Sequence, residues 1–98
     1  MKLVKLEDIY YFAVLNKTVY IKTKLITYTA SQALNYYEVK LQDSSFFRCH
    51  RAYLVNLDKV SRLIRYSKVN YDCGFADIRD VVPVSKAYLN SMQRLLGY

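Results

Sequence analysis

The sequence predicts one small domain of the mainly β class, with short turns and short helices. Hydrophobic residues make up 53% of the 98 residues, enough for one modest core, and this composition argues against disorder. Eleven tyrosines accompany many leucines, isoleucines and valines, and aromatic and β-branched residues favour strands. Only two glycines and one proline interrupt the chain. We therefore expect a single strand-rich domain over residues 1–98.

The first third of the chain predicts a hairpin of two strands. Residues 9–14 are a dense apolar and aromatic run, which is typical of a strand buried on both faces. Asn16 and Lys17 form a plausible turn. From Val19 onward, apolar residues alternate with Tyr20, Lys22 and Lys24, so we expect a half-buried strand whose outer face is basic.

The middle of the chain is predicted less uniformly. Thr29 is followed by Gln32 at the spacing of a capping box, and apolar residues then recur at helical spacing, which predicts an amphipathic helix over residues 30–42. The segment 46–60 has mixed periodicity, and local rules do not decide between helix and strand there.

The last third predicts a second hairpin, an edge strand and a helix. Residues 60–66 and 69–76 read as two strands around a short turn at residues 67–68. Pro83 favours an edge strand over residues 81–84, because proline cannot donate a ladder hydrogen bond. Ser85 can cap a final helix with one apolar stripe, which ends before Gly97.

The charge balance is the first indication of a partner. Fifteen Lys and Arg against eight Asp and Glu give a formal net charge of +7 and an isoelectric point near 9.5. Such an excess can gather on one face of the fold and attract polyanions, although an ordinary basic protein has the same composition. No apolar run approaches the ~18 residues of a membrane helix, and no signal peptide is recognisable. We expect a cytoplasmic protein with reduced, buried Cys49 and Cys73 and no membrane insertion.

Catalytic and metal sites find little support. The single histidine, His50, follows Cys49 directly, and neighbouring side chains of a strand point to opposite faces, so the two make a poor base and nucleophile. One histidine and two cysteines without close spacing do not make a zinc site. Two glycines cannot build a phosphate-binding loop. We expect no enzyme activity, no cofactor and no metal.

Three segments form ordered motifs along the chain. Residues 46–60 (FFRCHRAYLVNLDKV) contain an aromatic pair, a basic residue, a histidine and an apolar run closed by Asn. Residues 6–12 (LEDIYYF) form an acidic–Ile–aromatic strand entry, and residues 82–89 (VPVSKAYL) open the last helix. Together these segments closely resemble the signatures of LytTR domains, the DNA-binding output domains of many bacterial response regulators, and the resemblance spans residues 3–96.

The resemblance implies an elongated, mainly antiparallel β fold with two or three short helices, and no catalysis. It also implies sequence-specific binding of double-stranded DNA in transcription, with loops in successive major grooves at promoter direct repeats. A homodimer on DNA is expected. The chain begins close to residues 6–12 and has no room for a receiver domain, so it is expected to be either a fragment of a response regulator or a stand-alone protein controlled by a protein partner. An additional N-terminal strand of many family members is expected to be short or absent.

The residues that the resemblance places at the DNA are basic or polar and come from three segments. They are Asn16, Lys17 and Thr18 in the first turn, Arg48, His50 and Arg51 in the central signature, and Lys86 at the last helix; Lys22 and Lys24 are added from the basic strand face. Thr18 lies in the first turn, where family members often have His or Lys, and Lys86 lies where they often have Arg. Weaker recognition of bases is therefore expected at both positions. Arg48, Lys22 and Lys24 suit phosphates, Lys17, Arg51 and Lys86 suit base edges, and His50 is expected to brace its loop.

Two other functions stay open at this point. A protein-binding adaptor or inhibitor on the same fold would have little affinity for duplex DNA. A basic β-rich RNA binder would prefer single strands and stack bases on exposed tyrosines.

Overall fold

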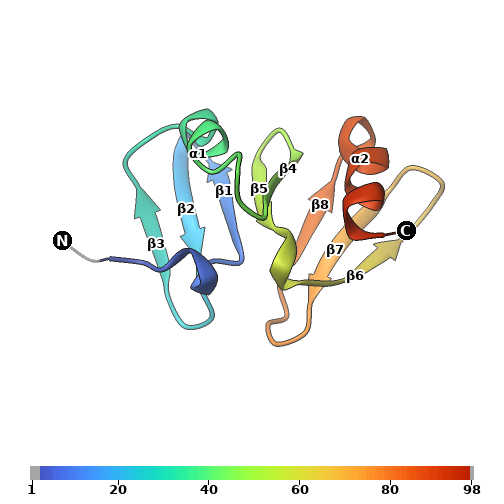
Figure 1. Ribbon diagram of the computed structural model, residues 1–98, viewed down its shortest axis with the longest axis horizontal. Coiled ribbons are helices and arrows are strands. Elements are labelled where there is room, and N and C mark those ends of the chain that lie inside the picture. The colour runs from blue at the N-terminus through green and yellow to red at the C-terminus, as the bar shows by residue number, and fades with distance from the viewer. Residues whose placement is uncertain (1–2, 98) are drawn as a thin grey trace.

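The computed structural model describes residues 3–97, which form eight strands, two α-helices and two short 3₁₀ helices (Figure 1). In chain order they are η1 (Leu6–Asp8), β1 (Tyr11–Leu15), β2 (Thr18–Lys22), β3 (Thr27–Ala30), α1 (Leu34–Lys40), β4 (Phe46–His50), β5 (Tyr53–Asn56), η2 (Leu57–Lys59), β6 (Val60–Arg65), β7 (Tyr71–Phe75), β8 (Val81–Val84) and α2 (Lys86–Leu96). The eight strands confirm the predicted mainly β class, and the principal extents of 43 × 27 × 26 Å confirm that the fold is elongated.

The strands form two antiparallel sheets that lie side by side along the long axis (Figure 1). The first sheet has the order β3-β2-β1-β5-β4, and the second has the order β6-β7-β8. Both predicted hairpins are confirmed, as β1–β2 and β6–β7. The strand with Pro83 is an edge strand, as predicted.

Each helix covers its own core, and β5 belongs to both. Leu54 of β5 packs with Phe12 and Phe46 in the cluster under α1. Its neighbour Val55 points the other way, into the cluster of the second sheet and α2. Successive side chains of a strand face opposite sides, so β5 contributes one residue to each of the two apolar cores and lies between them.

Two expectations about the first half were wrong. Thr29 does not begin a helix: it lies in β3 and pairs with Tyr20 of β2, and α1 starts only at Leu34, after Ala33. Tertiary pairing of a β-branched and aromatic stretch outweighs the local capping pattern here. The strand predicted from residue 9 begins only at Tyr11, after η1 and a short stretch of extended chain.

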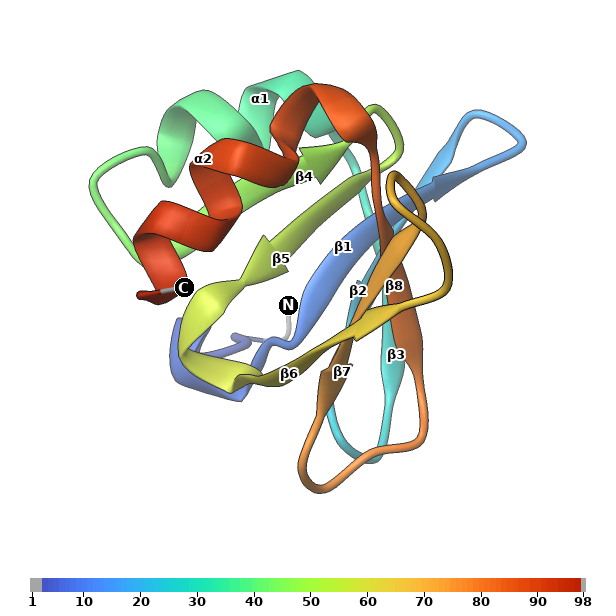
Figure 2. The same cartoon turned by 90° about the vertical axis from the view of Figure 1, so that its right-hand side faces the viewer.

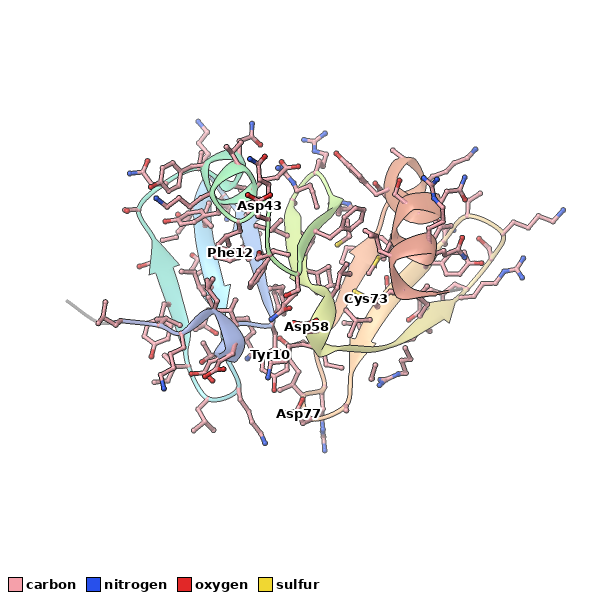
Figure 3. The ribbon with its side chains drawn as sticks, viewed as in Figure 1. Tyr10, Phe12, Asp43, Asp58, Cys73 and Asp77 are labelled. Atoms are coloured by element: carbon pink, nitrogen blue, oxygen red, sulfur yellow. The ribbon has the colours of Figure 1, made fainter. Side chains whose placement is uncertain are left out.

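Two hydrogen bonds between tyrosine and aspartate side chains link the two halves of the molecule on the side opposite the helices (Figure 3). Tyr10 donates a hydrogen bond of 2.6 Å to Asp77, and Tyr11 donates one of 2.6 Å to Asp80. Figure 3 shows Tyr10 and Asp77 meeting at the lower edge, between the sheets. The hydrogen bond to Tyr10 lowers the pKa of Asp77, whereas burial and the bond to Asp77 raise the pKa of Tyr10 to about 12.

Lysines of β2 and its loop reinforce the same carboxylates. Lys22 lies 3.7 Å from Asp80, and Lys24 lies 4.0 Å from Asp77. The expected basic outer face of β2 was therefore wrong for Lys22, whose side chain is turned toward the second sheet.

Candidate nucleic-acid interface

Three connections form a row along one edge of the molecule, which we call the loop edge. They are the β1–β2 turn with Asn16 and Lys17, the β4–β5 loop with Arg51, and the junction of β8 and α2 with Ser85 and Lys86. Figure 1 shows them spread along the long axis near the top, and Figure 2 shows all three in its upper part. The fold thus brings together three of the sequence segments that were expected to contact DNA.

The β1–β2 turn holds its residues in a conformation that glycine usually provides. Asn16 and Lys17 have φ angles of 50° and 68°, as a two-residue turn with the twist of a hairpin requires. Asparagine tolerates this region, but lysine at positive φ costs of order 1 kcal/mol. Both side chains are exposed, and Thr18 follows as the partly buried first residue of β2. A strained, solvent-facing lysine at a turn tip is suited to reaching a ligand.

A β-bulge at Cys49 directs the side chains of the central signature to different places. Arg48 pairs with Leu54, and His50 pairs with the very next residue, Tyr53, so Cys49 is the extra residue. Its buried thiol lies 3.6 Å from the carbonyl oxygen of Pro83. The prediction that both cysteines are buried is confirmed.

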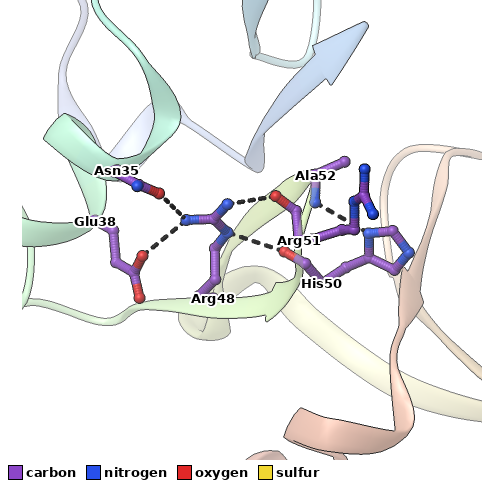
Figure 4. Close-up of polar contacts among 6 residues, drawn as sticks. All are labelled: Asn35, Glu38, Arg48, His50, Arg51 and Ala52. Carbon is purple, nitrogen blue, oxygen red and sulfur yellow. Dashed lines mark hydrogen bonds and ion pairs between the residues drawn. The ribbon is translucent and has the colours of Figure 1, made fainter.

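Arg48 lies inside a network rather than facing solvent (Figure 4). Its Nε donates to the carbonyl of His50 at 2.9 Å, and another guanidinium nitrogen donates to the carbonyl of Arg51. Its Nη1 contacts Asn35 at 2.9 Å and Glu38 at 2.7 Å, both on α1. The Arg48 side chain is only 13% exposed. This differs from the expected free phosphate contact, because most of its donors already have protein acceptors.

His50 braces the same loop from within. Its Nδ1 accepts a hydrogen bond of 3.0 Å from the backbone N–H of Ala52, as Figure 4 shows. Burial, followed by the charges of Arg51 and Arg48, lowers the pKa of His50. A neutral imidazole with an unprotonated Nδ1 is the form that this geometry requires. Arg51 itself is exposed at the loop tip.

The start of α2 is tied to this loop and borders a shallow groove. The N–H of Ser85 donates to the carbonyl of Cys49 at 2.9 Å, which fixes the helix beside the β4–β5 loop. A groove of about 370 Å³ joins His50 and Lys86 to the β6–β7 turn through Asn70. Lys86 is exposed in the first turn of α2, where free N–H groups and the helix dipole also favour anions.

The structure does not bring every expected residue to the loop edge. Lys22 lies at the far end of β2 in its ion pair with Asp80, and Lys24 follows it beside Asp77. The sequence analysis missed Asn35 and Glu38, which hold Arg48. No local signal marks them, since they lie 13 and 10 residues from Arg48 on another element. Among residues 3–97, no helix is long and apolar enough to cross a membrane.

Comparison with known proteins shows the family of the chain. The family described as the LytTr DNA-binding domain matches residues 1–97. The chain is 30% identical over 91 residues to the transcriptional regulatory protein YpdB of Escherichia coli, covering 93% of this chain and 37% of YpdB. It is 32% identical over 94 residues to the sensory transduction protein LytT of Bacillus subtilis, covering 96% of this chain and 39% of LytT. The chain therefore spans less than two fifths of these relatives.

A solved structure has the same fold. The LytTr DNA-binding domain of a putative methyl-accepting/DNA response regulator from Bacillus cereus superposes with a TM-score of 0.87 at 26% identity, covering 97% of this chain and 86% of that one. LytTR domains are DNA-binding regulatory domains rather than enzymes. The family match over nearly the whole length and the superposition on a solved LytTr domain give one conclusion: the chain belongs to the LytTR family of DNA-binding domains.

Proposed function

We propose that this protein is a sequence-specific binder of double-stranded DNA that regulates transcription through its loop edge. The observation that carries the proposal is the convergence of Lys17, Arg51 and Lys86, from three separate connections, on one edge of a chain with a net charge of +7. All three side chains are exposed. Cations placed this way satisfy both needs of a DNA reader, which are attraction to phosphates and access to base edges.

The dimensions of the molecule suit contact with successive grooves. Its long axis measures 43 Å, and one turn of duplex DNA is about 34–36 Å long. The β1–β2 turn and the start of α2 lie apart along this axis, with the β4–β5 loop between them (Figure 1). We assign the two outer elements to neighbouring major grooves and Arg51 to the minor groove between them. Promoter direct repeats, each occupied by one copy of a DNA-bound homodimer, belong to the same proposal.

The candidate residues divide into readers and braces. Lys17, Arg51 and Lys86 are the readers, and Asn16 and Thr18 support the turn that presents Lys17. Arg48 and His50 are positioning residues, because their hydrogen bonds end on the β4–β5 loop itself. Lys22 has no part at the edge, since it serves the contact between the sheets.

Selection from a randomised duplex pool tests this function. Several rounds of selection should enrich a direct repeat whose half-sites are separated by one or more helical turns. On the enriched duplex, Lys86→Ala should relax the preference at one base position at a cost of ~1–3 kcal/mol. Lys40→Ala, which removes a charge from the end of α1, should leave that preference unchanged.

Failure of the selection would favour a different role. If no sequence enriches and binding to every duplex disappears at physiological salt, the DNA reader is refuted, and a protein-binding adaptor on the same fold becomes the better account. If duplex binding is found, we propose in addition that a protein partner or a further domain controls it.

A further inference from the structure

The β6–β7 turn, residues 66–70, is a fourth connection beside the loop edge. It joins β6 and β7 at the outer end of the second sheet, next to the junction of β8 and α2 in both Figure 1 and Figure 2. The groove that contains His50 and Lys86 is closed on its other side by Val69 and Asn70 of this turn. The turn therefore continues the row of connections beyond the start of α2.

The turn is well formed, and basic residues lie in it and at the end of β6 that precedes it. Arg65 and Lys68 are both exposed, and the segment from residue 62 to residue 71 contains no Asp or Glu. Nε of Arg65 donates to the carbonyl of Ser67 at 3.1 Å, and the N–H of Tyr66 donates to the carbonyl of Asn70 at 2.9 Å. The bond from Nε fixes the guanidinium on the turn and directs its remaining nitrogens away from that carbonyl.

One acid follows the turn. Asp72 lies on β7 and lines the same groove as Lys86, and its carboxylate raises the pKa of Tyr66. Lys68 stands at the middle of the five-residue connection, as far along the chain from both strands as the turn allows. Among residues 3–97, the ion pairs with carboxylates involve neither Arg65, the last residue of β6, nor Lys68 in the turn.

We infer that the β6–β7 turn is a phosphate clamp that extends the DNA footprint outward from the start of α2. Arg65 and Lys68 contact the sugar–phosphate backbone at the border of the DNA major groove that is assigned to the start of α2 and Lys86. The contact carries affinity but no base preference, because phosphates are the same at every sequence. This inference rests on the proposed function, and it adds two cations to a surface that the sequence motifs limited to three segments.

The test is a salt titration of the whole chain on a 30-base-pair duplex of unselected sequence. The Arg65→Ala/Lys68→Ala variant should give a plot of log Kobs against log salt that is shallower by about 1.8, since each lost phosphate contact removes ~0.9. The matched control is Lys40→Ala/Arg94→Ala, which removes the same two charges from the C-terminal turns of α1 and α2. The control should keep a slope close to that of the wild type.

A second variant guards against damage to the turn. Lys68→Ala alone leaves the Arg65–Ser67 bond in place and should make the slope shallower by ~0.9. Both variants should lose the same factor on a selected duplex as on the unselected one. Slopes equal to that of the control overturn the clamp while the DNA-binding function stands. A wild type that binds no duplex instead overturns the proposed function, whatever the variants do.

Discussion

Replacement of Arg48 by methionine tests whether this residue holds the β4–β5 loop in place or contacts a DNA phosphate. Methionine keeps much of the aliphatic stem and removes the guanidinium, which contacts Asn35, Glu38 and the carbonyls of His50 and Arg51. We expect lower stability and weaker binding to all duplexes, with an unchanged dependence on salt. The reason is that the substitution loosens the β4–β5 loop without removing a cation from the DNA.

The magnitude follows from the burial of the partners. Hydrogen bonds with one charged partner contribute ~1.5–3 kcal/mol when well formed. The partly buried bond to His50 is assigned about 1.5 kcal/mol on this scale. The Glu38 side chain is 44% exposed, so its ion pair is assigned no more than ~1 kcal/mol. The exposed contacts with Asn35 and Arg51 add little, which gives a total of roughly 2–3 kcal/mol.

Two measurements on the same protein check this prediction. Urea unfolding should show a loss of roughly 2–3 kcal/mol for Arg48→Met, and Lys40→Met, an exposed cation of α1, should change stability by less than ~0.5 kcal/mol. Duplex titrations should give the Arg48→Met variant the salt slope of the wild type. Unchanged stability together with a slope shallower by ~0.9 would refute the reasoning, since that pattern is the signature of a lost phosphate contact.

Three further predictions concern the sheet contact, the loop and the first turn. Tyr11→Phe should lower the free energy of unfolding by ~1 kcal/mol in urea titrations, because Asp80 loses a 2.6 Å hydrogen bond; no change would mean that water replaces the hydroxyl. The pKa of His50 is lower in the folded chain than in the unfolded chain, so as the pH falls the unfolded chain takes up the imidazole proton first. Stability should therefore fall as pH drops below 6.5 and level off below the folded pKa. His50→Gln should lack this part of the pH profile, and an identical profile would show that burial and the neighbouring arginines do not lower the pKa of His50 in the folded chain. Lys17→Gly should unfold no more easily than the wild type, since glycine accepts a φ of 68°, yet bind duplex DNA more weakly in anisotropy titrations; equal binding would remove Lys17 from the interface.

The parts of the fold that local chemistry controls could be predicted. The turn at Asn16, the edge strand at Pro83 and the helix end at Gly97, whose φ of 84° suits a left-handed cap, each depend on residues within a few positions of one another. Strand β3 could not be predicted, because it is defined by pairing with β2 and the local pattern at Thr29 favours a helix start.

The candidate site was predicted as a set of segments but not as a set of roles. The family signature indicated Arg48, and the alternating strand pattern indicated Lys22, in both cases because the residue is basic. Their partners, Glu38 and Asp80, lie 10 and 58 residues away and are brought close only by the packing of α1 against β4 and of the two sheets against each other. Lys17 and Lys86 stayed available because a turn tip and a helix start leave their side chains in solvent.

The central claim is that the loop edge reads DNA sequence, and a specificity ratio tests it most directly. The affinity of the whole chain for the selected duplex should be compared, at physiological salt, with its affinity for a scrambled duplex of equal length and composition. The account predicts a ratio of about 10³ or more, which falls when Lys86 is replaced by alanine. A ratio near one, with both affinities vanishing together as salt rises, would show a basic surface without sequence recognition and contradict the claim.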